Sequence, residues 1–168
     1  MVQIHVNQAH ENQFLYNCPC TSTIDETARE IIQIYNLQAK IHHLVPKVEE
    51  RLLSESKECH TDSILAIRRV LSEAKTYASK DQVLYKKALS SHILRDHIQS
   101  IEGAMAANLG LLPDSDLWKQ LFSDLELLHE DETQLWWAGK ELFRDKRLSD
   151  FVGSNEKTKI VIRLRSPG

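Results

Sequence analysis

The sequence is poor in the residues that build the common catalytic and phosphate-binding motifs. Only 5 glycines, 4 prolines and 3 cysteines occur among 168 residues. The glycines are isolated, so there is no glycine-rich phosphate loop, and neither a nucleophile elbow nor a paired-carboxylate motif is present. We therefore expect no enzymatic activity, no catalytic residue and no cofactor.

Long apolar runs and an excess of one charge sign are also lacking. No apolar stretch approaches the roughly 20 residues that a helix needs to cross a bilayer. The formal net charge of −3 gives no long-range attraction to nucleic acid or to an anionic membrane. The odd number of cysteines, 3, and a start without a signal peptide favour a reducing compartment. We expect a soluble, cytoplasmic monomer that binds neither membrane nor nucleic acid.

The cysteines form one candidate metal site. Cys18, Cys20, Cys59 and His60 together have the side chains to ligate zinc. However, Cys18 and Cys20 are separated by one residue where zinc sites usually have two or more, and Cys18 shares a strand face with Phe14. Buried structural thiols are the default, so we expect no metal site.

Strand patterns stand at both ends of the chain. Val2, Ile4 and Val6 alternate with polar residues, and a second alternating run covers residues 13–18. A capping box at residues 23–26 then begins a helix. Near the other end, residues 135–142 and 159–164 alternate around a turn-rich stretch. Two closing strands bury too little apolar area to form a stable sheet alone, so we expect both ends to meet in one sheet.

The middle of the chain, residues 37–131, has helical apolar spacing. We expect Pro46 to kink a helix or to start a new one, a long helix to begin near Leu84, and a last helix to span residues 117–128. The predicted fold class is α+β. Its sheet comes from residues 1–36 and 132–168, and residues 37–131 form a helical insertion.

Several short motifs at the two ends of the chain carry a resemblance to known proteins. The order of elements and the corner Leu148-Ser149-Asp150-Phe151 resemble a ubiquitin-like β-grasp. A second set of motifs covers about half of the chain: Met1-Val2, His5-Val6, Gln13-Phe14-Leu15, Tyr35-Asn36, Gln134-Leu135-Trp136-Trp137-Ala138, Lys140-Glu141-Leu142, Leu148–Gly153 and Asn155–Ile160. By these motifs the chain is similar to the Kurly family of cilia- and flagella-associated proteins.

The Kurly resemblance implies a non-catalytic protein-interaction factor for motile cilia. The implied role is cytoplasmic assembly of axonemal dynein arms, with assembly factors or chaperones as partners. The implied locations are the cytoplasm, the cilium base or basal body, and the axoneme. A general ubiquitin-like cytosolic adaptor and an axonemal structural protein are the alternatives. Unlike family members, the chain has no proline- and glycine-rich stretch in its insertion and no long charged tail after the last strand, so we expect a shortened or divergent relative.

The candidate binding site lies on the face of the sheet away from the first helix. If Leu135 and Trp137 face that helix, Trp136 and Val161 lie together on the outer face, where a tryptophan suits a binding hot spot. Lys140 and Arg163 add positive charge that would suit an acidic partner. The competing expectation is that the helical insertion covers this face, so that Trp136 is a core residue and the cations form only a solvated surface.

Overall fold

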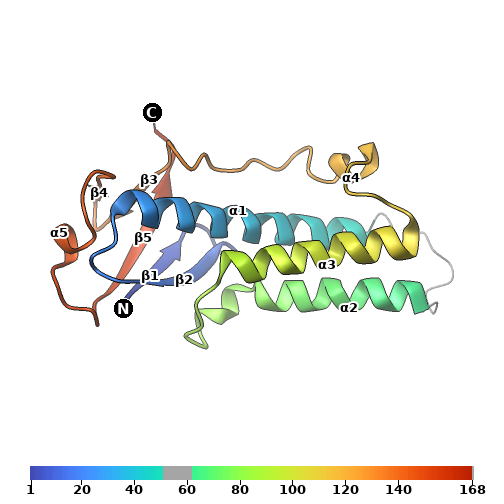
Figure 1. Ribbon diagram of the computed structural model, residues 1–168, viewed down its shortest axis with the longest axis horizontal. Coiled ribbons are helices and arrows are strands. Elements are labelled where there is room, and N and C mark those ends of the chain that lie inside the picture. Colours follow the sequence, from blue (N-terminus) through green and yellow to red (C-terminus); the bar gives the residue numbers. More distant parts are fainter. Residues whose placement is uncertain (51–61, 168) are drawn as a thin grey trace. The chain divides into compact units, whose positions relative to one another are not determined.

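The structure is a computed structural model that describes residues 1–50 and 62–167, and its centre is a five-stranded sheet of order β2-β1-β5-β3-β4 (Figure 1). Helices α1 to α4 stand between the second and third strands in the sequence. The elements in chain order are β1 Val2–Asn7, β2 Gln13–Cys18, α1 Ile24–Val48, α2 Asp62–Tyr77, the short 3₁₀ helix η2 Lys80–Gln82, α3 Ser91–Leu109, α4 Asp116–Gln120, β3 Gln134–Trp137, β4 Lys140–Leu142, α5 Ser149–Val152 and β5 Lys159–Arg165.

The two ends of the chain meet in this sheet, as the sequence predicts. β1 pairs in parallel with β5, so that Ile4 lies opposite Ile160, and β5 pairs antiparallel with β3. Gln8 extends the first of these ladders with its side chain. Its Nε2 donates to the Leu164 carbonyl at 2.8 Å, and the Leu164 amide donates to its Oε1 at 2.7 Å. The α+β class is confirmed, and the strand order is consistent with a ubiquitin-like β-grasp carrying a helical insertion.

One face of the sheet holds the core of this part of the chain. Ile4 and Ile162 are fully buried and Ile160 is nearly so. The first half of α1, drawn in blue, crosses this inner face (Figure 1). Its start is capped as expected, because the Glu26 amide donates to the Thr23 hydroxyl at 3.1 Å. Each buried branched side chain contributes roughly 1.5–3 kcal/mol, so the alternation at both ends of the chain fixes which face is inside.

A loop after β4 fastens the start of α1. The Ile24 amide donates to the Lys146 carbonyl at 2.8 Å, and the Leu148 amide donates to the Ser22 carbonyl at 2.9 Å. The Asp150 carboxylate accepts from the Arg147 amide at 2.8 Å. This is the local corner cap that aspartate commonly forms at turns.

The chain divides into two compact units. The first, here called the sheet unit, contains Met1–Asn36, Ser79–Ser91 and Leu127–Gly168. The second, the helical unit, contains Leu37–Ala78 and His92–Glu126. In the helical unit α2 buries Ile64, Ile67, Leu71 and Ala74, which recur at the three- and four-residue spacing of one helix face. No helix among the described residues is long and apolar enough to span a membrane.

Pro46 lies inside α1, so of the two expectations for it the start of a new helix is excluded. Two helix boundaries in the middle of the chain differ from the expectation. α3 begins at Ser91 and not near Leu84, because the preceding segment returns to the sheet, where the Leu89 amide donates to the Leu15 carbonyl at 3.0 Å. The last helix of the insertion spans only Asp116–Gln120.

The segment after α4 is held by a side chain of α1 instead of continuing as a helix. Asn36 makes two hydrogen bonds of 2.9 Å with the backbone of Leu128, one as donor and one as acceptor. These bonds pair both the amide and the carbonyl of Leu128, so neither group needs a helical partner.

Candidate functional site

The candidate binding site lies on the outer face of the sheet unit, and strand pairing decides which residues belong to it. Trp136 lies opposite Arg163, and Val161 lies opposite His5. Val161 is 51% exposed, whereas its neighbours Ile160 and Ile162 are buried. Residues that pair directly share a face, so these four side chains stand on the side away from the buried core.

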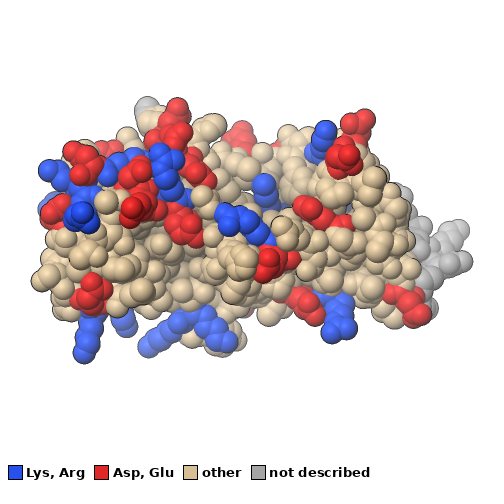
Figure 2. Space-filling model, in the orientation of Figure 1, with Lys and Arg blue, Asp and Glu red and all other residues tan. Residues whose placement is uncertain are grey.

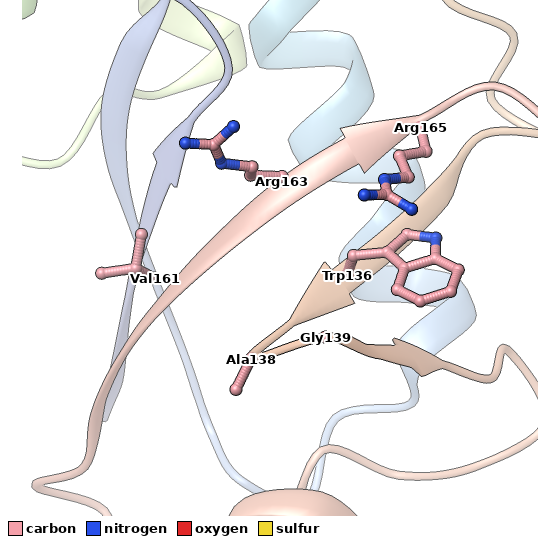
Figure 3. Close-up of a pocket in the computed structure, with 6 residues that line it drawn as sticks. All are labelled: Trp136, Ala138, Gly139, Val161, Arg163 and Arg165. Carbon is pink, nitrogen blue, oxygen red and sulfur yellow. The ribbon is translucent and has the colours of Figure 1, made fainter.

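Trp136 is partly buried, and its immediate partners are strand residues. Its indole Nε1 donates to the Gln134 Oε1 at 3.0 Å. The guanidinium of Arg165 lies over the ring, with Cζ 4.6 Å from the ring centroid (Figure 3). This geometry is a cation–π contact, worth roughly 0.5–1 kcal/mol at an exposed position. One face of the tryptophan ring is therefore covered by Arg165.

A shallow hollow of about 250 Å³ lies beside the tryptophan, and the close-up in Figure 3 shows its lining. The β3–β4 turn supplies one wall. Ala138 and Gly139 have positive φ angles of 51° and 81°, as the central residues of a tight two-residue hairpin turn require. The lining residues are Trp136, Ala138, Gly139, Val161, Arg163 and Arg165.

A second hollow of about 230 Å³ continues this depression across β5 and β1. Val161 lines both hollows. The far side is formed by Leu15 and by the segment that follows η2. We call the two hollows together the outer groove. The second hollow is lined by Gln3, His5, Leu15, Val83, Lys86, Lys159, Ile160 and Val161.

The charge around the outer groove is positive and largely uncompensated. Among the described residues, Lys86, Lys159 and Arg163 take part in no salt bridge. Arg165 lies over the Trp136 ring and, within residues 1–50 and 62–167, is likewise in no salt bridge. Figure 2 shows Lys and Arg side chains projecting from the lower margin of the sheet unit, with few Asp or Glu among them. An acidic group entering this groove would meet cations without displacing an existing ion pair.

Three of the four predicted site residues line the groove together. These are Trp136, Val161 and Arg163. Lys140 does not, because it pairs with Trp137 and so has the opposite orientation. Glu141 pairs with Trp136 and takes that place on the outer face. Binding at these residues remains a proposal.

Arg165 lines the groove but is not among the four predicted site residues. A signal for it was present, because position 165 continues the alternation of 161 and 163 on β5. What the sequence alone did not give is the register between β5 and β3, which places Arg165 beside Trp136.

The cysteines have no catalytic or metal-binding geometry among the described residues. Cys18 and Cys20 are free, buried thiols. A hydrogen bond with the Glu156 carboxylate raises the pKa of Cys20, and burial raises the pKa of Cys18. Both effects lower the fraction of reactive thiolate. Within residues 1–50 and 62–167, no group of three or more His, Cys, Asp or Glu could hold a metal ion. Cys59 and His60 of the zinc hypothesis lie outside the described residues.

Fold and surface together describe a mixed α+β protein whose two ends build one sheet with a cationic, tryptophan-containing groove. Residues 133–168, which include β3, β4 and β5, match the family model of cilia- and flagella-associated protein 298. The chain is thus similar to this family. The matched stretch contains all six residues that line the first hollow.

Curated relatives extend this similarity to the whole chain. The cilia- and flagella-associated protein 298 of Rattus norvegicus is 27% identical over 224 aligned positions, which cover 100% of this chain and 77% of the relative. The proteins of the same name from Homo sapiens and Drosophila melanogaster are 26% and 22% identical over the same shares. No solved structure matches the chain.

Proposed function

We propose that this chain is a non-catalytic protein-interaction factor that supports motile cilia, through cytoplasmic assembly of axonemal dynein arms. One observation carries the proposal. The stretch that matches the model of cilia- and flagella-associated protein 298 is the same stretch that supplies β3 and β5, and hence the first hollow. The family match thus includes the strands that carry the first hollow.

The groove has the properties of a protein-binding surface. Trp136 and Val161 offer apolar area beside arginines, and tryptophan and arginine are the residue types most enriched at binding hot spots. The partners in this proposal are dynein-arm assembly factors or chaperones. The chain acts as a monomer in the cytoplasm and at the cilium base or basal body.

The test is a genetic replacement in a ciliated cell. The endogenous gene is removed and the cells are complemented with the wild-type chain or with Trp136→Ala, at matched protein levels. Loss of the gene should reduce beat frequency and the number of dynein arms seen by electron microscopy, and the wild-type chain should restore both. Normal motility and normal arms in the null cells would contradict the proposal.

A second candidate function is a general ubiquitin-like adaptor in the cytosol. The strand order β2-β1-β5-β3-β4 favours it, because this order is compatible with a β-grasp. Affinity capture from ciliated cells separates the two functions. Recovery of dynein chains or their assembly factors supports the ciliary role, whereas recovery of ubiquitin-pathway proteins alone supports the adaptor.

A further inference from the structure

The outward side of β5 is a row of cations interrupted by one apolar residue. Lys159, Val161, Arg163 and Arg165 are exposed, and the residues between them are buried. Outward side chains on one strand repeat about every 6.6 Å, twice the rise of a residue. An extended peptide repeats its own side chains at the same interval. The row therefore matches an extended chain that carries complementary groups at every second position.

The rest of the outer face adds little negative charge to this row. Glu141 is the one acidic residue among the outward positions of the described strands. Outward positions of β1 and β2 are held by neutral or titratable residues such as Gln3 and His5. Lys86 adds a further cation from the segment after η2. The outer face therefore has few negative charges that would repel an acidic partner.

We infer that the outer groove binds an extended acidic segment of a partner protein. Carboxylates at alternate positions contact Lys159, Arg163 and Arg165, and one apolar side chain between the first two carboxylates contacts Val161. This inference rests on the proposed function and specifies the chemistry of its partner. A guanidinium receives a carboxylate through two parallel hydrogen bonds, so both arginines suit such a ligand.

The contact between Arg165 and Trp136 gives this binding a built-in readout. In the free protein the guanidinium covers the ring, at 4.6 Å from its centroid. A carboxylate that recruits the guanidinium uncovers the indole. The indole then loses its charged neighbour, so its fluorescence should change on binding.

The charge balance favours an acidic peptide over nucleic acid. The whole chain has a net charge of −3 although the groove is positive, so the remainder of the surface is more acidic still. A nucleic-acid strand extends beyond a short groove and would meet that acidic surface, whereas domains that bind nucleic acid are usually basic overall. A short acidic segment fits within the groove.

The experiment uses the full chain and a fluorescein-labelled peptide, Glu-Ser-Leu-Ser-Glu-Ser-Glu, together with the same peptide in reversed order. Fluorescence polarisation should show saturable binding of at least one order, weaker at roughly 300 mM than at 50 mM salt because the contacts are screened. A peptide with lysine in place of glutamate should not bind. A peptide with its glutamates in one block should bind more weakly than the alternating peptide.

A matched pair of charge reversals locates the site. Arg163→Glu should weaken peptide binding at least about tenfold. Arg68→Glu makes the same change on the exposed side of α2, in the helical unit, and should leave binding unchanged. Circular dichroism melting shows that both variants are folded. The indole fluorescence change on binding should disappear in Trp136→Phe.

Three results would overturn the inference: equal loss in both reversals, no saturable binding of either acidic peptide, or tighter binding of a single-stranded oligonucleotide. Each of these leaves the proposed function standing if null cells still lose motility. Conversely, normal motility in null cells would contradict the proposed function, whereas peptide binding that depends on Arg163 would still support the inference. The two failures are therefore distinguishable.

Discussion

At the scale of single residues, the role of Trp136 depends on how much of its ring is exposed. The sequence offered two expectations for it, an exposed hot spot or a core residue beneath the insertion. The ring is partly buried, with Arg165 over its face, so neither extreme applies. A side chain with one face under a guanidinium at the surface contributes to stability and remains reachable by a ligand.

Trp136→Ala should therefore cost less than a core truncation. A fully buried tryptophan loses roughly 3–5 kcal/mol on truncation to alanine, and we expect about 1–2 kcal/mol here, because the ring is partly buried and its cation–π contact is surface-exposed. Urea unfolding followed by circular dichroism measures the difference. A loss near that of a core residue would contradict the partial burial of the ring.

Ala138 is the one described residue of the β3–β4 turn that carries a side chain in an unfavourable conformation. Its φ angle of 51° is in the left-handed region, where non-glycine residues are strained by about 1–2 kcal/mol. Ala138→Asn should raise the free energy of unfolding by roughly 0.5–1 kcal/mol, because Asn-Gly is the favoured pair for this turn. Ala138→Val should lower it, since a β-branched residue tolerates the conformation worst. A change in the same direction for both variants would contradict this account.

At the scale of elements, ion pairing fastens α1 to the segment before β3 and to the loop after β4. The carboxylate of Asp25 accepts from Arg144 at 2.8 Å and from Arg29 at 3.0 Å. Arg144 also donates to the carbonyls of Thr133 and Glu130. Its guanidinium therefore links the helix start to two backbone positions that precede β3.

This arrangement predicts a pH dependence of stability. The hydrogen bond from Arg144, and next that from Arg29, holds the pKa of Asp25 below its usual value of 3.8. A carboxyl with a lowered folded-state pKa stabilises the fold above its unfolded pKa, and this contribution is lost as the pH falls through the lowered value. Melting temperatures measured below about pH 4 should fall less steeply for Asp25→Asn than for the wild type. Equal slopes would show that Asp25 contributes no linkage.

The elements differ in how well local sequence predicts them. The strands and α2 were predictable, because Val2, Ile4 and Val6 or Ile64, Ile67 and Leu71 carry the periodicity within one segment. The bounds of α3 and α4 were not. They depend on contacts between distant segments, such as the bonds of Asn36 to a residue 92 positions away. Arg165 was not among the predicted site residues for the same reason, since cross-strand register is a property of two segments together.

At the scale of the whole molecule, the sheet makes the first strand and the last strands interdependent. β1 lies between β2 and β5, so loss of β1 separates β2 from the rest of the sheet. Ile4 is fully buried at the centre of β1 and lies opposite Ile160. A substitution in β1 should therefore also destabilise the strands at the other end of the sequence.

Ile4→Ala should lower the free energy of unfolding by roughly 2–5 kcal/mol, and Ile4→Val by only about 0.5–1.5 kcal/mol. Urea unfolding of both variants should be followed by tryptophan fluorescence, since Trp136 and Trp137 lie in β3 on the far side of β5. The fluorescence transition should shift by the same amount as the circular dichroism transition. A fluorescence midpoint unaffected by Ile4→Ala would mean that the two ends unfold separately.

The side chain of Gln8 has a consequence for how the backbone exchanges with solvent. Leu164 donates its amide proton to a glutamine oxygen at 2.7 Å and not to a strand carbonyl. In heavy water this proton should be retained as long as those of the neighbouring ladder, and Gln8→Ala should release it selectively. The side-chain amide of Gln8 thus protects the Leu164 amide of β5 from exchange, although the pairing of β5 with β1 has already ended at Ile162.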